Sequence, residues 1–163
     1  VDAYLSAKFR VNSDVTDLSL GGYTTEGFVE ALSTVVDGAL AEAGCSAADI
    51  DHAVFPQDDV KTSWRGGSRL GFDADQMSAG FVVNRAGFAG VASPLLGFAA
   101  ALDTADPGTR ILVAGYGYGH GASAFVFETT DESADASAGV DAALDATAEL
   151  ELADYVQLQE VTN

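Results

Sequence analysis

The chain contains the sequence Val83-Asn84-Arg85-Ala86-Gly87-Phe88-Ala89-Gly90-Val91-Ala92-Ser93-Pro94-Leu95-Leu96-Gly97-Phe98, followed by Arg110-Ile111-Leu112-Val113-Ala114-Gly115-Tyr116-Gly117-Tyr118-Gly119-His120-Gly121. The first stretch is rich in Ala and Gly and becomes apolar around Pro94, a residue that the first turn of a helix tolerates. The second is an apolar run that ends in alternating glycines. These patterns predict a helix over residues 90–103 and strands over 110–115 and 122–128, joined by a glycine turn.

The rest of the chain alternates between helical and extended patterns. The further predicted elements are a weak strand over 4–11, a helix over 25–43, a strand over 52–55, a helix over 60–70, a helical turn over 73–77 and a last helix over 143–159. Thr24 or Thr25 caps the helix over 25–43, whose apolar residues recur every three or four positions, and Gly44 ends it. Ser46 and Asp49 have the spacing of a capping box.

Strands that alternate with helices indicate an α/β fold, with helices on both faces of a mixed sheet. With 163 residues the chain can form one sizeable core, and no run approaches the ~20 apolar residues of a membrane span. The sheet is small, and the helix over 90–103 has small residues on its early face. We therefore expect this helix to pack against another domain. A bulky residue at Gly97 is expected to break that assembly and to leave the isolated domain largely helical.

The chain is strongly acidic, with 25 acidic and 7 basic residues and a formal net charge of −18. Such a surface repels nucleic acid and anionic lipid headgroups. Two explanations remain open: adaptation to a salt-rich cytoplasm, or docking of a cationic partner. The acidic residues are spread through every segment, which favours the first, and we expect a cytoplasmic protein of a high-salt organism. The single cysteine, Cys45, excludes an internal disulfide and a thiolate metal site.

Residues 21–127 resemble the second half of thiolase-fold acyltransferases, most of all 3-hydroxy-3-methylglutaryl-CoA synthase of the archaeal type and 3-oxoacyl-ACP synthase III. The resemblance rests on the two stretches quoted above and on the spacing from Asp49-Ile50-Asp51 to Leu70-Gly71-Phe72-Asp73. It implies the C-terminal half of a five-layer αβαβα fold. On this basis we expect the chain to divide into four segments. They are an N-terminal segment over 1–22 with a candidate edge strand, a thiolase-like half-domain over 23–130, an acidic linker over 131–142 and a C-terminal helix over 143–163.

The catalytic positions of the resembled family are altered in this chain. Family members have a histidine and a glutamine after the strand over 52–55, where this chain has Pro56 and Gln57, and Phe88 occupies the family's asparagine position. The resemblance therefore implies that Pro56 and Phe88 fill the oxyanion-binding space with apolar surface. The remaining catalytic candidates are His120, in the glycine turn, and Asn84, four residues before Phe88. His52 opens a buried strand, where we interpret it as a packed histidine.

The same resemblance suggests coenzyme A or acyl-CoA as a ligand, without a covalently bound cofactor. Lys61, Trp64 and Arg65 could hold its nucleotide through cations beside an aromatic ring, and Gly117 and Gly119 could cradle a phosphate. We favour the simpler interpretation of the same residues, an ordinary exposed helix and a tight glycine turn.

The altered catalytic positions predict a structural or regulatory partner in an acyl-CoA condensing complex, itself without catalysis. Two alternatives stay open: an active acyltransferase whose nucleophile comes from another chain, and an acyl-CoA binding module. The expected partner is a thiolase-like N-terminal half or a homologous subunit, with an OB-fold subunit as a further possibility, so the protein is expected to be oligomeric.

Overall fold

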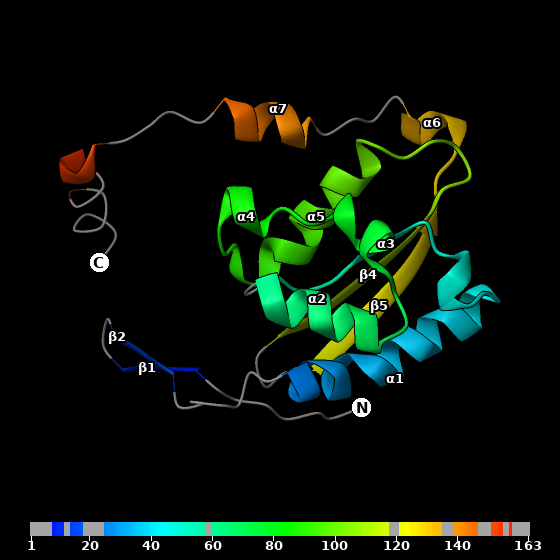
Figure 1. The fold of residues 1–163 in the computed structure, drawn as a ribbon, viewed down its shortest axis with the longest axis horizontal. Helices are drawn as coiled ribbons and strands as arrows, with labels where there is room; N and C mark the ends of the chain where they lie inside the picture. Colours follow the sequence, from blue (N-terminus) through cyan, green and yellow to red (C-terminus); the bar gives the residue numbers. More distant parts are fainter. Residues whose placement is uncertain are drawn as a thin grey trace.

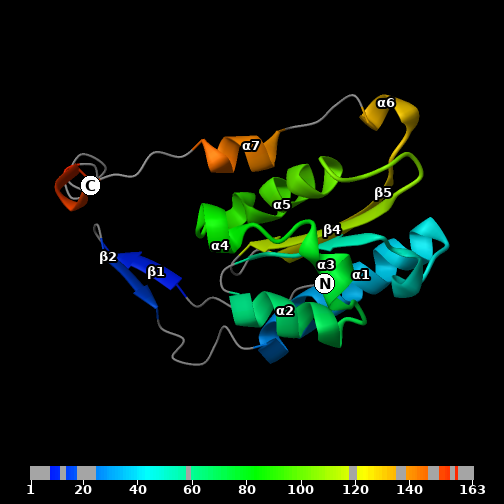
Figure 2. The same ribbon diagram turned by 45° about the horizontal axis from the view of Figure 1, so that its top comes forward.

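The computed structural model describes residues 8–11, 14–17, 25–57, 60–117, 121–134, 139–146, 151–154 and 157. The main body is layered, with a three-stranded sheet at its centre (Figure 1). Helix α1 (Thr25–Ala43) and, beside it, helix α2 (Val60–Arg69) lie on one side of the sheet, and helix α5 (Ser93–Leu102) lies on the other. Helix α7 (Val140–Asp145) lies beyond α5, on the side away from the sheet (Figure 2). The predicted α/β class is confirmed.

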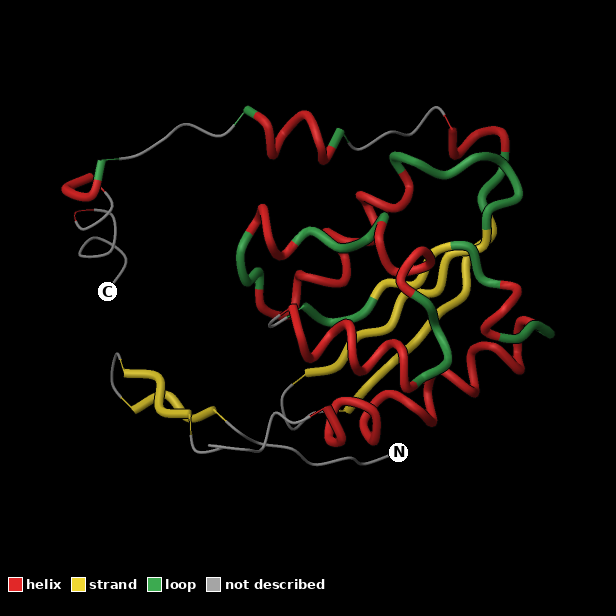
Figure 3. The backbone as a smooth tube through the Cα atoms, viewed as in Figure 1, coloured by secondary structure: helices red, strands yellow, loops and turns green. Residues whose placement is uncertain are grey.

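The sheet has the strand order β3-β4-β5. Its strands are β3 (His52–Val54), β4 (Arg110–Gly117) and β5 (Gly121–Glu128), drawn in yellow in Figure 3. β3 runs parallel to β4, and β5 returns antiparallel beside β4. The sheet is therefore mixed, and the long connection between β3 and β4 carries the helices that shape the candidate site.

The core forms on both faces of the sheet. On one face Leu32, Val36 and Leu40 of α1 lie at helical spacing and pack toward Leu112. On the other face the sheet packs against α5, in a cluster formed by Val54, Ala101, Ile111 and Val113. The apolar spacing of α1 and the apolar strands thus fold as the sequence predicts, because each buries its apolar side against the sheet.

The end of α1 follows the predicted capping signals. Gly44 has φ +66°, a left-handed conformation that ends the helix. Asp49 Oδ2 then accepts hydrogen bonds from the Ser46 backbone N–H at 2.8 Å and the Ser46 hydroxyl at 2.7 Å. These bonds cap the short 3-10 helix η1 (Ala47–Asp49) that leads into β3, so the interpretation of this segment as a capping box is confirmed.

Between β3 and β4 the structure agrees with the predicted helices and adds one. α2 matches the predicted span within one residue, and Asp73 caps α3 (Ala74–Ser78) by accepting from Gln76 N–H at 2.9 Å. The additional helix is α4 (Val83–Ala86). The helix expected over 90–103 begins only at Ser93, after the 3-10 helix η2 (Gly90–Ala92), because Gly90 has φ +59° and Pro94 lies in the first turn of α5.

The two ends of the chain differ from the expectations in detail. β1 (Lys8–Val11) pairs antiparallel with β2 (Asp14–Asp17), a strand that was not predicted, whereas residues 4–7 lie outside the description. The expected acidic linker starts with the helical turn α6 (Asp131–Ala134), and α7 begins at Val140 rather than at residue 143 and ends at Asp145. Residues 152–154 are helical again, and Tyr155 lies outside the described residues.

None of the helices that the structure describes combines the length and the apolar character needed to cross a membrane.

Candidate functional site

The end of β3 is where the resembled family carries its catalytic histidine. Here Pro56 is buried, and its carbonyl oxygen accepts a hydrogen bond of 2.6 Å from the Ser63 hydroxyl of α2. Proline has no titratable group and no backbone N–H. This position therefore fastens the end of β3 to α2 and offers no acid or base.

Gln57, the next residue, is the centre of a buried hydrogen-bond network. Its side chain is 2% exposed, and its Oε1 accepts from the backbone N–H groups of Val82 at 2.9 Å and Val83 at 3.0 Å. Its Nε2 donates to Gly80 O at 2.6 Å, and its backbone N–H donates to Ser93 Oγ at 3.1 Å. Gln57 thus fixes the starts of α4 and α5 relative to β3. The sequence showed that this glutamine matches the resembled family. It did not show its hydrogen-bond partners, because they lie 23 to 36 residues away along the chain.

The space around Gln57 is nearly closed. The cavity lined by Ala53, Phe55, Gln57, Ser63, Met77, Gly80 and Phe81 has a volume of about 10 Å³. A single water needs about that much room. This cavity, formed by described residues, is therefore too small for an acyl group.

Asn84 and Phe88 do not line this cavity. Asn84 lies on α4 with an exposed side chain, and Phe88 is 51% exposed. Pro56 is buried beside α2, whereas Phe88 lies on the surface of this domain. That the two residues together fill one apolar space stays a prediction.

The glycine turn is described only at its edges. Gly117 ends β4 and is paired in register with Gly121, which starts β5. His120 and Gly119 lie outside the described residues, so their roles stay predictions. His52 is partly buried, and among the described residues its Nδ1 atom is enclosed without a hydrogen-bond partner.

The three residues suggested for a nucleotide all belong to α2. Lys61 and Arg65 are exposed and lie one helical turn apart. Trp64 is half-buried, and its ring packs on Phe81 with centroids 5.1 Å apart. One side of the indole is thus used for packing, and the two cations form a separate exposed pair. In the described part of the chain no cluster of three or more His, Cys, Asp or Glu side chains could hold a metal ion.

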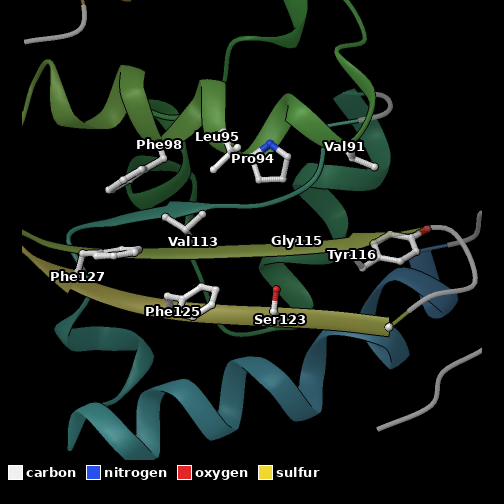
Figure 4. A pocket seen from close by; sticks show the side chains of 11 residues that line it. Val91, Pro94, Leu95, Phe98, Val113, Gly115, Tyr116, Ser123, Phe125 and Phe127 are labelled. Atoms are coloured by element: carbon white, nitrogen blue, oxygen red, sulfur yellow. The ribbon is translucent and has the colours of Figure 1, made fainter.

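An apolar groove lies beside α5 (Figure 4). It has a volume of about 440 Å³, and α5, β4 and β5 form its walls. We call this surface the α5–β5 groove; it is lined by Val91, Pro94, Leu95, Phe98, Val113, Gly115, Tyr116, Gly121, Ser123, Phe125 and Phe127. None of the described residues that line it is charged, although the chain as a whole carries a net charge of −18.

Large apolar side chains of the groove are open to solvent. Val91 is 73% exposed, Leu95 67%, Phe125 58% and Phe127 42%. The Phe98 and Phe127 rings stack across the groove, with centroids 4.9 Å apart and an interplanar angle of 27°. A contiguous apolar surface of this kind marks a site of contact with another molecule or domain. From the sequence we expected that one face among Val91, Leu95, Leu96 and Phe98 would stay unburied, and Val91 and Leu95 are the exposed ones. The contribution of Phe125 and Phe127 from β5 was not predicted.

The groove corrects the expected contact of the small-residue helix. Ser93 and Gly97 are buried inside this domain, and Gly97 faces the Gly80 carbonyl and Gln57. The exposed side chains are Val91 of η2 and Leu95 of α5 instead. Ser93 and Gly97 let α5 approach β3 and its following loop, whereas Leu95 faces outward.

Sequence comparison places this chain beside one group of enzymes, although no family model matches it. It is 45% identical over 94 residues to the hydroxymethylglutaryl-CoA synthase of Methanopyrus kandleri, covering 58% of this chain and 27% of that protein. It is 36% identical over 113 residues to the synthase of Methanococcoides burtonii, covering 69% of this chain and 32% of that protein. The chain thus spans about a third of the length of these curated relatives.

Solved structures give the same picture of the fold. The β-ketoacyl-[acyl carrier protein] synthase III of Thermus thermophilus superimposes with a TM-score of 0.62 at 22% identity, over 74% of this chain and 37% of that one. PksG, an HMG-CoA synthase from Bacillus subtilis, gives a TM-score of 0.74 at 13% identity, over 93% of this chain and 42% of that one.

The fold is therefore thiolase-like, as the sequence predicted. Within this class the chain is similar to hydroxymethylglutaryl-CoA synthases, and its resemblance to the C-terminal half of such an acyltransferase is confirmed.

Proposed function

We propose that this chain is a subunit of an acyl-CoA condensing complex that completes the assembly without performing catalysis. In this proposal the α5–β5 groove packs against a thiolase-like N-terminal half or a homologous subunit. The observation that carries the proposal is the groove itself, an uncharged apolar surface on a chain of net charge −18.

The end of β3 supports the absence of catalysis. A general acid or base must titrate and must reach the reacting atom. Pro56 does neither, because proline has no titratable side chain and this residue is buried. The adjacent cavity of about 10 Å³ is too small for a substrate group. Both polar side-chain atoms of Gln57 bond to backbone groups.

The exposed face of α2 supports a role for acyl-CoA as a ligand of the complex. Lys61 and Arg65 are exposed cations one turn apart in a chain with few basic residues. A pair of this kind suits the phosphates of coenzyme A. Trp64, which lies between them in the sequence, is half-buried and also packs on Phe81.

The first experiment measures thiol release from acetyl-CoA and acetoacetyl-CoA by the purified chain in molar KCl. We expect the rate to stay at background. Turnover that is lost in His120→Ala or in Asn84→Ala would contradict the proposed absence of catalysis and would favour the acyltransferase alternative.

The second experiment tests the groove through the mass of the assembly, measured by size exclusion with light scattering. Val91→Asp places a charge in the groove, whereas Val60→Asp places one on α2, where Val60 is 45% exposed and does not line the groove. We expect the wild type and Val60→Asp to form the same oligomer and Val91→Asp to be monomeric. A strictly monomeric wild type, or equal masses for all three, would contradict the proposed contact.

A further inference from the structure

Helix α7 covers the side of α5 that faces away from the sheet (Figures 1 and 2). Val140 is 7% exposed and forms a small apolar cluster with Val82 and Ala100. Leu144 packs against the same cluster, together with Leu96 and Ala99 of α5. The contact is apolar but small, because the other α7 side chains are exposed.

The polar anchors of α7 come from α4 and from the end of α5. The Asp103 carboxylate accepts from the backbone N–H groups of Gly139 at 3.1 Å and Val140 at 2.6 Å, which caps the start of the helix. Arg85 of α4 binds the carboxylates of Asp141 and Asp145 through its two terminal nitrogens. Both aspartates lie on one face of α7, four residues apart, so one guanidinium contacts both carboxylates.

α7 depends on these contacts for its helical form. It has six residues, and isolated helices shorter than about 12–15 residues are marginal in water. The ion pairs are exposed, since the side chains of Arg85, Asp141 and Asp145 are 38%, 71% and 79% accessible, and salt screens such pairs. α7 is therefore an element that can detach while the sheet stays folded.

The position of α7 matters because it borders the α5–β5 groove. Leu95 and Leu96 are consecutive residues of α5: Leu95 lines the groove and is 67% exposed, and Leu96 packs in the cluster with α7. A partner that covered α5 across its width would meet α7 at the rim of the groove.

We propose that α7 is an intramolecular cover of α5 that must detach before a partner subunit can seat fully on this helix. The inference rests on the proposed function, because the partner is the homologous subunit that the groove would bind. Detachment uncovers the apolar residues Val82, Leu96, Ala99 and Ala100 beside the groove.

Hydrogen exchange measured by mass spectrometry on the full chain tests the cover. Arg85→Ala removes both ion pairs of α7, and Arg110→Ala is the matched control, because Arg110 makes an exposed ion pair with Glu128 at 3.1 Å away from α7. We expect the amides of Ala143 and Ala146, which are bonded in α7, to exchange about tenfold faster in Arg85→Ala while β4 stays protected. The control should leave α7 unchanged. Unchanged protection in Arg85→Ala, or loss of protection in α7 and β4 together, would overturn the proposal.

Light scattering on the same variants separates this inference from the proposed function. If α7 competes with the partner, Arg85→Ala shifts the monomer–oligomer equilibrium toward the oligomer at equal concentration, and Arg110→Ala does not. An Arg85→Ala variant that opens α7 without any gain in assembly would overturn the competition. The groove itself is tested by Val91→Asp, so failure of that variant to dissociate the oligomer counts against the proposed function instead.

Discussion

At the scale of single residues, the helical glycines Gly97 and Gly38 differ in the space available for a side chain. A Cβ at Gly97 would lie 2.5 Å from Gly80 O and 2.8 Å from Gln57 Nε2, whereas a Cβ at Gly38 of α1 would meet nothing within 4 Å. We predict that Gly97→Ala lowers the free energy of unfolding by about 1–3 kcal/mol through overpacking. Gly38→Ala should raise it by about 0.5–1 kcal/mol through helix propensity.

Urea unfolding of the two variants is the direct measurement. The result also distinguishes two roles for Gly97: close packing inside this domain, as the structure shows, and the assembly contact that the sequence predicted. A Gly97→Ala domain as stable as the wild type would mean that α5 can shift away from Gly80. It would favour the role in assembly.

Gln57 offers a second prediction at this scale, one that depends on pH. Gln57→Glu keeps the acceptor for Val82 and Val83 N–H, but only the protonated acid can donate to Gly80 O. Burial and the nearby carbonyl oxygen raise the pKa of the new carboxyl in the folded state. The folded state then binds more protons than the unfolded state, so the free energy of unfolding falls as the pH rises.

The measurement is a set of urea midpoints between about pH 4 and pH 8 for Gln57→Glu, Gln57→Leu and the wild type. Gln57→Leu should be destabilised by roughly 2–4 kcal/mol across this range, because it leaves buried backbone groups without partners. A Gln57→Glu profile parallel to that of Gln57→Leu would contradict the proposed donor to Gly80 O.

At the scale of secondary-structure elements, the turn between α1 and β3 is stabilised by one carboxylate. The hydroxyl and the backbone N–H of Ser46 hold the pKa of Asp49 below its ordinary value. A lowered folded pKa means that this contribution to stability is present above the pKa of the unfolded state and is lost as the pH falls through the folded value. We predict that Ser46→Ala raises the pKa of Asp49. An NMR titration of the Asp49 carboxyl measures it, with Ser33→Ala on α1 as a serine control that should leave Asp49 unchanged.

The predictability of each element follows from the range of the contacts that define it. α1, η1 and α3 were predicted because their caps lie within the same segment: Gly44 ends α1, and Ser46 and Asp73 begin the next turns. The start of α7 was not predicted, because the carboxylate that caps it, Asp103, is 36 residues away from Gly139.

The candidate site was only partly predictable for the same reason. Pro56 at the histidine position and an unburied apolar face near Leu95 were visible in the sequence, but Gln57 as an anchor and the β5 side of the groove were not. Leu95 and Leu96 are the same residue type in one apolar helix, and only the packed structure shows that α7 covers one and leaves the other exposed.

At the scale of the whole molecule, charge and apolar surface are separated. The acidic residues lie throughout the chain, whereas none of the described residues that line the α5–β5 groove is acidic. In the assembly proposed above, a partner would cover the groove without bringing like charges into the contact.

The same charge predicts how salt acts on the folded chain. With a net charge of −18, the folded state holds its carboxylates closer together than the unfolded chain does, so their repulsion destabilises it. Salt shortens the Debye length from about 10 Å at 0.1 M to about 3 Å at 1 M. We predict a clearly higher thermal midpoint in ~2 M KCl than in ~0.1 M KCl.

The matched variant replaces Glu30, Asp37 and Glu42, all exposed on α1, with their amides. It should have a higher midpoint than the wild type at low salt and a smaller gain from KCl. Equal midpoints at both concentrations would instead favour the second explanation of the charge, in which the acidic side chains await a cationic partner.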